Sequence, residues 1–317
     1  MKRNILTTLA LVVCLCGING YADSNAKEYI DSAVVKCVNS DYEGALKDCD
    51  KAIELDPKNA NVYSNRGFAK GALSDYKGAI EDYTKAIELD PKSENAYYNR
   101  GFTKCNLDDY TGAVEDCTKA IGLNPKYAEA YYWRGNSKSG LSDYAGAIKD
   151  YTKVIELCPQ NVNAYSLRAI SKNNLQDYSG AIQDYGKAIE LDPKNVNAYY
   201  YRGFAKGNLD DHEGAIPDYT KAIELDPKNA GAYFNRGYAK GYLGDYKGAI
   251  KDYTKAIELD SKDADAYANR GFAKEQLNDK SGALEDLSKA GELGYTDAYK
   301  EIKRIQDTRF QESGAAD

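Results

Sequence analysis

Two series of opposite charges recur along the chain at regular intervals. A buried arginine needs a partner, because an isolated charge in a protein interior is costly. We therefore expect the two series to pair as a ladder, with a solvent-exposed charged face as the alternative. The arginines are Arg66, Arg100, Arg134, Arg168, Arg202, Arg236 and Arg270, and the aspartates are Asp82, Asp116, Asp150, Asp184, Asp218, Asp252 and Asp286.

Residues of the kinds that serve in catalysis are otherwise few. His212 is the only histidine, and corresponding positions elsewhere carry Tyr76, Tyr110 or Tyr246. We interpret it as a substitute for a structural tyrosine rather than as a catalytic base or metal ligand. No metal-ligand cluster, phosphate-binding glycine loop or nucleophile elbow is evident. We therefore expect no enzymatic activity, no metal and no cofactor.

The recurring charges belong to a unit of 34 residues that is shown most clearly by the segment NANVYSNRGFAKGALSDYKGAIEDYTKAIELDPK. A fixed period of this length predicts a solenoid of helical hairpins, an all-α fold whose core lies between neighbouring repeats. Eight copies follow one another without an insertion, at residues 25–58, 59–92, 93–126, 127–160, 161–194, 195–228, 229–262 and 263–296.

Each unit is predicted to contain two helices, which in the second copy span residues 60–73 and 77–89. Apolar and small residues recur there three or four positions apart, which is helical spacing. Pro91 ends the second helix because it has no backbone N–H. Gly67 lies in the middle of the first helix, where glycine costs up to about 1 kcal/mol relative to alanine. We expect the second helix to approach the first closely at this glycine.

The spacing of the key residues resembles the signature of the tetratricopeptide repeat family over about 270 of the 317 residues. Arg66 and Lys70 depart from it, because the family usually has leucine and often tyrosine there. The resemblance implies a right-handed superhelix whose inner groove is lined by the first helices and binds peptides or partner proteins. The matching residues in the second copy are Tyr63, Gly67, Tyr76, Ala79, Tyr83, Ala86 and Pro91.

By the same resemblance, a stripe of aromatic residues beside the packing face of the first helices should face the groove. Exposed rings would favour ligand binding, and neighbouring asparagines could pair with the backbone of an extended peptide. The phenylalanines could instead pack against the next helix, whereas Tyr98, Tyr132 and Tyr200 would need hydroxyl partners if they were buried. The predicted groove residues are Phe68, Tyr98, Phe102, Tyr132, Asn136, Tyr200, Phe204, Phe234, Tyr238 and Phe272.

The two ends of the chain differ from the repeats. Residues 1–22 have the basic start, short apolar middle and small residues of a secretory signal peptide, which predicts export to the periplasm or outside the cell. A lipid anchor at Cys14 or an uncleaved membrane anchor is the alternative. Residues 297–307 are predicted to form a capping helix, and residues 308–317 a disordered tail.

The composition limits the classes of partner. The net charge of −7 becomes −9 if Lys2 and Arg3 are cleaved off, and such acidity argues against nucleic acid as a ligand. We expect a protein or extended peptide as partner, and no stable membrane span after cleavage. The main hypothesis is an exported bacterial interaction scaffold. The alternative is a structural or glycan-binding envelope protein that holds polysaccharide or peptidoglycan.

Overall fold

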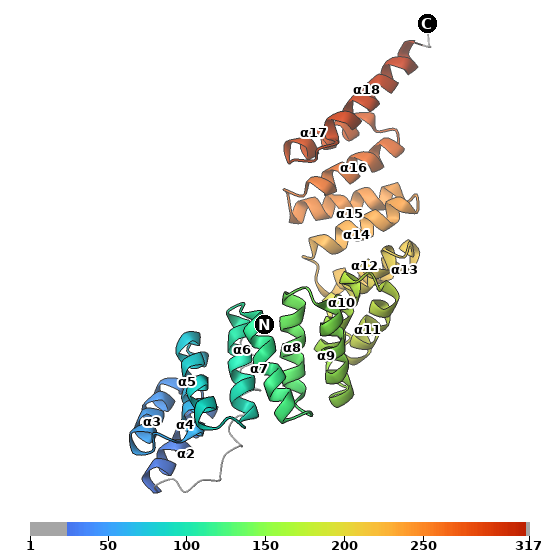
Figure 1. The fold of residues 1–317 in the computed structure, drawn as a ribbon. Helices are drawn as coiled ribbons and strands as arrows, with labels where there is room; N and C mark the ends of the chain where they lie inside the picture. The colour runs from blue at the N-terminus through green and yellow to red at the C-terminus, as the bar shows by residue number, and fades with distance from the viewer. Residues whose placement is uncertain (1–23, 315–317) are drawn as a thin grey trace. The chain divides into compact units, whose positions relative to one another are not determined.

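The computed structural model describes residues 24–314, and this part of the chain is built from α-helices joined by short turns. Figure 1 shows them as a succession of antiparallel hairpins. The all-α repeat fold expected from the 34-residue period is therefore confirmed. The signal peptide predicted for residues 1–22 lies outside the described residues.

The chain divides into two compact units, residues 1–164 and 165–317. The helices that begin in the first unit are α2 (Ser24–Val38), α3 (Tyr42–Leu55), α4 (Ala60–Ala72), α5 (Tyr76–Leu89), α6 (Glu94–Asn106), α7 (Tyr110–Leu123), α8 (Ala128–Gly140), α9 (Tyr144–Leu157) and α10 (Val162–Asn174). Those of the second unit are α11 (Tyr178–Leu191), α12 (Val196–Gly207), α13 (His212–Leu225), α14 (Ala230–Tyr242), α15 (Tyr246–Leu259), α16 (Ala264–Gln276), α17 (Lys280–Glu292) and α18 (Ala298–Gly314).

Local sequence signals set the helix boundaries. The side chain of Asp75 accepts a hydrogen bond from the Gly78 N–H at 3.0 Å, which caps the N-terminus of α5. At the other end, Asp90 adopts an extended conformation directly before Pro91, where the helix cannot continue. The two helices of this repeat lie within a residue of the predicted spans.

Small residues let the two helices of each repeat cross closely. Ala79 and Ala86 of α5 are fully buried. A Cβ atom added to Gly67 of α4 would lie 3.0 Å from the Tyr83 ring and 3.1 Å from the Ala79 carbonyl oxygen. The predicted close approach at this glycine is therefore confirmed, and packing against Tyr83 offsets the low helix propensity of glycine.

The first helix of each repeat lies on the inner side of the curve within each unit. Successive first helices, such as α4 and α6 or α14 and α16, contact each other more extensively than successive second helices do. Elements on the inside of a curved stack approach each other most closely. The concave face of each unit is therefore lined by first helices.

Helix α18 closes the second unit. Ile305 of α18 is fully buried in a cluster with Leu287 and Ala268, so the helix covers the apolar surface of the last repeat. It extends to Gly314, beyond the predicted end at residue 307. None of the helices described is both long and apolar enough to cross a membrane.

Candidate functional site: an aromatic groove in the second unit

The predicted arginine–aspartate ladder is present and lies within the repeats. Arg100 donates two hydrogen bonds to Asp116, from Nε at 2.8 Å and from Nη2 at 2.7 Å. Asp116 is 3% exposed, and its hydrogen bonds raise the pKa of the Arg100 guanidinium. The same two-bond pairing recurs at each arginine of the series. The ladder assigns these aspartates a structural role.

Each rung contains more than the predicted pair. Lys104 Nζ lies 2.8 Å from the second oxygen of Asp116, and Arg100 Nη1 also donates to the Thr84 hydroxyl of the preceding repeat. Sequence reasoning missed the lysine, although its recurrence one helical turn after the arginine was a signal for it. In the first repeat, Ser32 and Lys36 take the places of arginine and lysine at Asp48.

In the first unit, the structure buries two members of the predicted stripe. Tyr98 is 2% exposed and its ring packs on that of Tyr127 at a centroid distance of 4.9 Å. Phe68 is 6% exposed and contacts Tyr42. The expectation that Tyr98 stands exposed in the groove is wrong, because Tyr127 covers it. Phe68 packs against its neighbours, which was the alternative given for the phenylalanines of the stripe.

Three other predicted residues of the first unit are half-buried, and two of them contact Trp133. The ring of Phe102 lies 4.6 Å from that of Trp133, and the ring of Tyr132 lies 5.5 Å from it. Asn136 accepts a hydrogen bond from the Tyr151 hydroxyl at 2.7 Å. All three residues therefore remain partly exposed, with their neighbours covering part of each side chain.

In the second unit, two residues of the predicted stripe are well exposed. Phe204 and Tyr238 are 40% and 48% exposed. Phe272 is half-buried, and Phe234 packs against Tyr253 at 5.7 Å. Tyr200 is also half-buried, and its hydroxyl accepts a hydrogen bond from the Asn235 side chain at 3.0 Å. Phe204, Tyr238 and Phe272 therefore remain as candidate contacts for a ligand.

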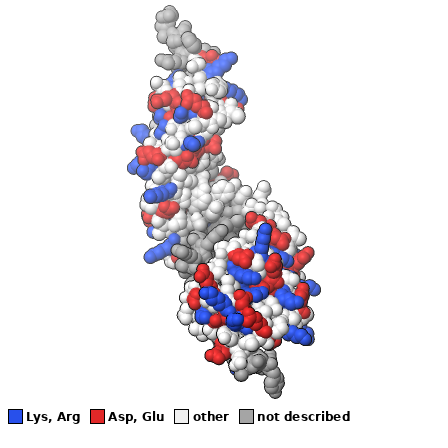
Figure 2. Space-filling model, turned by 90° about the vertical axis from the view of Figure 1, so that its left-hand side faces the viewer, with Lys and Arg blue, Asp and Glu red and all other residues white. Residues whose placement is uncertain are grey.

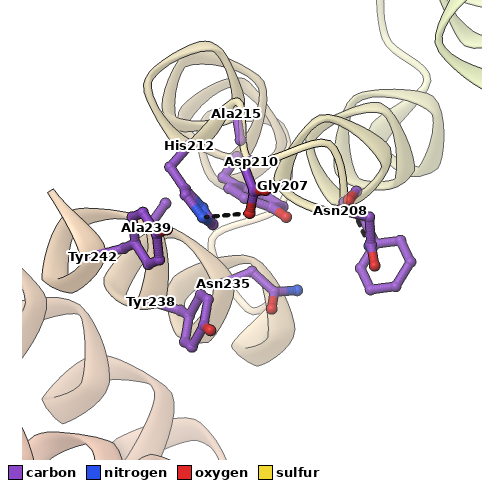
Figure 3. Close-up of a pocket in the computed structure, with 11 residues that line it drawn as sticks. Gly207, Asn208, Asp210, His212, Ala215, Asn235, Tyr238, Ala239 and Tyr242 are labelled. Carbon is purple, nitrogen blue, oxygen red and sulfur yellow. Dashed lines mark hydrogen bonds and ion pairs between the residues drawn. The ribbon is translucent and has the colours of Figure 1, made fainter. Parts of the chain in front are cut away.

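A pocket of about 370 Å³, here called the His212 pocket, lies between the hairpin of α12 and α13 and the next first helix, α14. Its volume lies within the range of about 300 to 1,000 Å³ that is usual for small-ligand sites. Figure 3 shows nine of its residues labelled around the opening. Its lining is Phe204, Gly207, Asn208, Asp210, His212, Ala215, Tyr219, Asn235, Tyr238, Ala239 and Tyr242.

His212 forms one wall of this pocket. Its side chain is 6% exposed, and its ring lies 4.0 Å from that of Tyr242 and 6.0 Å from that of Tyr238. Nε2 points toward the carboxylate of Asp210, which is 3.9 Å away (Figure 3). The histidine thus occupies the position of the repeat tyrosine, as predicted, and it also shapes a concave surface.

A second pocket of about 170 Å³, here called the Phe272 pocket, lies between α14, α15 and α16. It shares Tyr238 and Tyr242 with the His212 pocket, so the two pockets adjoin on the groove face. Its lining residues carry no formal charge. They are Tyr238, Gly241, Tyr242, Tyr246, Tyr253, Asn269, Phe272, Ala273 and Gln276.

Tyr242 and Asp210 were missed by the sequence reasoning, which looked for residues that recur. Tyr242 departs from the residues at its position in the other repeats, and Asp210 lies at a turn position whose residue varies between repeats. Tyr242 is 64% exposed, and no other repeat has an aromatic residue at its position. The equivalent residues are Val38, Ala72, Asn106, Gly140, Asn174, Asn208 and Gln276.

Positive and negative side chains are mixed on the surface, so charge differs between the two pockets only through their own lining residues. On the face shown in Figure 2, Lys and Arg side chains are interspersed with Asp and Glu side chains. Among residues 24–314 no cluster of three or more histidine, cysteine or acidic side chains has the arrangement to hold a metal ion. What the groove offers a ligand is therefore aromatic surface, amide groups and the carboxylate of Asp210.

Solved structures share this fold. The MamA protein is 26% identical, with 55% of this chain and 95% of that chain covered and a TM-score of 0.52. YrrB, described as a TPR protein with an unusual peptide-binding site, is 24% identical, with 58% and 95% covered and a TM-score of 0.54. A tetratricopeptide repeat protein from Parabacteroides merdae ATCC 43184 is 21% identical, with 79% and 99% covered and a TM-score of 0.56.

Family models provide the assignment. No curated protein matches the chain significantly. The TPR repeat model matches residues 39–74, 72–108, 173–210, 209–241 and 242–278, which together exceed half of the chain. Further tetratricopeptide repeat models match residues 94–127 and 128–161. With its stacked hairpins and its buried alanines and glycines, the chain belongs to the tetratricopeptide repeat family.

Proposed function

We propose that this protein is a non-catalytic scaffold that binds a protein partner by holding an extended peptide segment in the groove of its second unit. The observation that carries the proposal is the pair of adjoining pockets that share Tyr238 and Tyr242. Membership of an interaction-repeat family and the fold shared with the peptide-binding YrrB support it.

The chemistry of the groove suits a peptide. Phe204, Tyr238 and Tyr242 expose aromatic surface on neighbouring helices, and exposed apolar surface gathered in one place is typical of interaction sites. Asn208 and Asn269 lie within the pocket linings, where amide groups can pair with peptide N–H and C=O groups. A chain laid across both pockets would bury side chains in each while its backbone contacts the amides.

Replacing Tyr238 by alanine is expected to weaken binding of the partner at least about tenfold, because this ring belongs to both pockets. The partner is isolated by affinity capture from an envelope extract, and its purified form is titrated by calorimetry. Because Tyr238 is 48% exposed, the helical content and melting temperature should change little.

The matched control is Tyr299→Ala on α18, which removes a ring that is 69% exposed and lines neither pocket. It should bind like the parent protein. Equal affinities for the parent and the folded Tyr238→Ala variant would place the binding surface elsewhere. Retention on insoluble cell-wall material without a protein partner would point to the glycan-binding alternative.

We also propose that the protein is exported, on the strength of the basic, apolar and small-residue order of residues 1–22. When it is produced in a bacterial host, mass spectrometry of the intact protein should find an N-terminus near Asp23. A product that retains Met1 in the cytoplasmic fraction would contradict export.

A further inference from the structure

Asp210 and Asp108 lie at equivalent turn positions, but their carboxylates have different partners. Asp108 occupies the corresponding turn position in the first unit, where it accepts a hydrogen bond from the Tyr110 hydroxyl at 2.7 Å. His212 replaces that tyrosine beside Asp210, and its Nε2 stays 3.9 Å away, which is beyond hydrogen-bonding distance. The side chain of Asp210 is 87% exposed. The carboxylate of Asp210, at the rim of the pocket, thus lacks the short hydrogen bond that Asp108 accepts.

The pocket that Asp210 borders is also lined by three partly exposed aromatic rings, and no lysine or arginine is among its lining residues. Phe204, Tyr238 and Tyr242 are all exposed in part. The basic side chains nearby are already paired: Lys206 lies 2.8 Å from Asp218, and Lys240 lies 2.7 Å from Asp252. A carboxylate at the rim of a pocket that exposes aromatic rings attracts a cation, which the carboxylate binds by charge and the rings by their quadrupole.

This combination is specific to one repeat. The turn position of Asp210 carries Ser40, Ser74, Ser142, Gln176, Gly244 or Asn278 elsewhere, apart from Asp108. His212 is the only histidine of the chain. Residues that hold the solenoid together recur in nearly every repeat, as the ladder does. The combination of Asp210, His212 and Tyr242 occurs once in the array, so stacking of the repeats does not require it.

We propose that the His212 pocket binds the guanidinium group of an arginine side chain in the bound peptide. Guanidinium is planar, so it can stack on an aromatic face while it donates two parallel hydrogen bonds to one carboxylate. The uncharged Phe272 pocket then takes an apolar side chain of the same peptide. This inference rests on the proposed function and names the chemistry that its groove selects.

The test compares an arginine peptide with its neutral analogue. The probes are fluorescein-labelled Gly/Ser nonapeptides that carry one arginine and one leucine separated by one to four residues, and matched peptides with citrulline in place of arginine. Their dissociation constants for the full chain are measured by fluorescence anisotropy. The best arginine peptide is expected to bind at least about fivefold more tightly than its citrulline counterpart.

Three variants locate the effect. Asp210→Asn should abolish the preference for arginine, while the matched Asp108→Asn should keep it. Asp210 adopts a φ of 60°, which asparagine tolerates. His212→Tyr restores the repeat residue and should also reduce the preference, because its hydroxyl would bind Asp210 as Tyr110 binds Asp108. Circular dichroism and thermal melts check that each variant is folded.

The outcomes separate this inference from the proposed function. If arginine and citrulline peptides bind the parent protein equally well, the arginine site is overturned while the peptide groove stands. If none of the peptides binds, both the arginine site and the peptide groove are overturned. A preference for arginine that persists in folded Asp210→Asn would also overturn the site.

Discussion

Replacing Asp116 by alanine is expected to lower the free energy of unfolding by about 3 to 5 kcal/mol, which is the usual cost of removing one partner from a buried ion pair. Asp116 is 3% exposed. It accepts two hydrogen bonds from Arg100 and forms an ion pair with Lys104. Its removal leaves the largely buried cations Arg100 and Lys104, whose side chains are 17% and 19% exposed, without this counter-charge. The loss is measured by urea unfolding followed by circular dichroism.

The control is the exposed ion pair between Lys85 and Glu88, whose side chains are 48% and 59% exposed. Replacing Glu88 by glutamine should cost less than about 1 kcal/mol, because water screens surface pairs. Repeat arrays can unfold in parts, so hydrogen exchange should show the loss of protection centred on α6 and α7. Similar losses in the two variants would show that the ladder contributes no more than a surface pair.

Replacing Tyr151 by alanine is expected to cost about 3 to 5 kcal/mol, as is usual when a large aromatic side chain is removed from a core. Tyr151 is 1% exposed and contacts Tyr132, and its hydroxyl donates to Asn136 at 2.7 Å. Tyr151→Phe, which keeps the ring, should cost only about 1 kcal/mol. Equal losses for the two variants would mean that the hydroxyl, and not ring packing, carries the contribution. Both are measured by urea unfolding.

Gly135 provides an independent check on this packing. A Cβ atom at Gly135 would lie 2.8 Å from the Tyr151 ring, so Gly135→Ala should destabilise the parent protein. In the Tyr151→Ala variant the ring is absent, so that close contact is absent too. The higher helix propensity of alanine then favours Gly135→Ala. The cost of Gly135→Ala should therefore fall by at least about 1 kcal/mol in the Tyr151→Ala background. Additive effects would rule out this packing account.

The sequence by itself determined the repeat and its local structure. Aspartates at the helix starts and proline after the helix ends act through the backbone of their own segment, so their effect can be read without knowing the neighbours. The ladder could also be predicted. A hairpin with a fixed period brings the same two positions together in every copy, and a charge at a packing position must be paired.

Exposure along the aromatic stripe was decided by tertiary contacts. Tyr98 and Tyr200 have the same place in their repeats, but Tyr98 is buried under Tyr127, whereas the position that corresponds to Tyr127 in the repeat after Tyr200 is Asn229. A large neighbour from the next repeat covers one ring, and a small polar residue leaves the other half-buried. The pattern within one helix contains no information about that neighbour.

The His212 pocket likewise emerged only in three dimensions. Asp210 lies in a turn, His212 begins α13, and Tyr238 and Tyr242 lie one helical turn apart on α14. The sequence shows each of them as a separate departure from the repeat or as one more aromatic residue. Packing of α14 against the preceding hairpin brings them around one cavity, because residues from successive repeats meet only when the repeats stack.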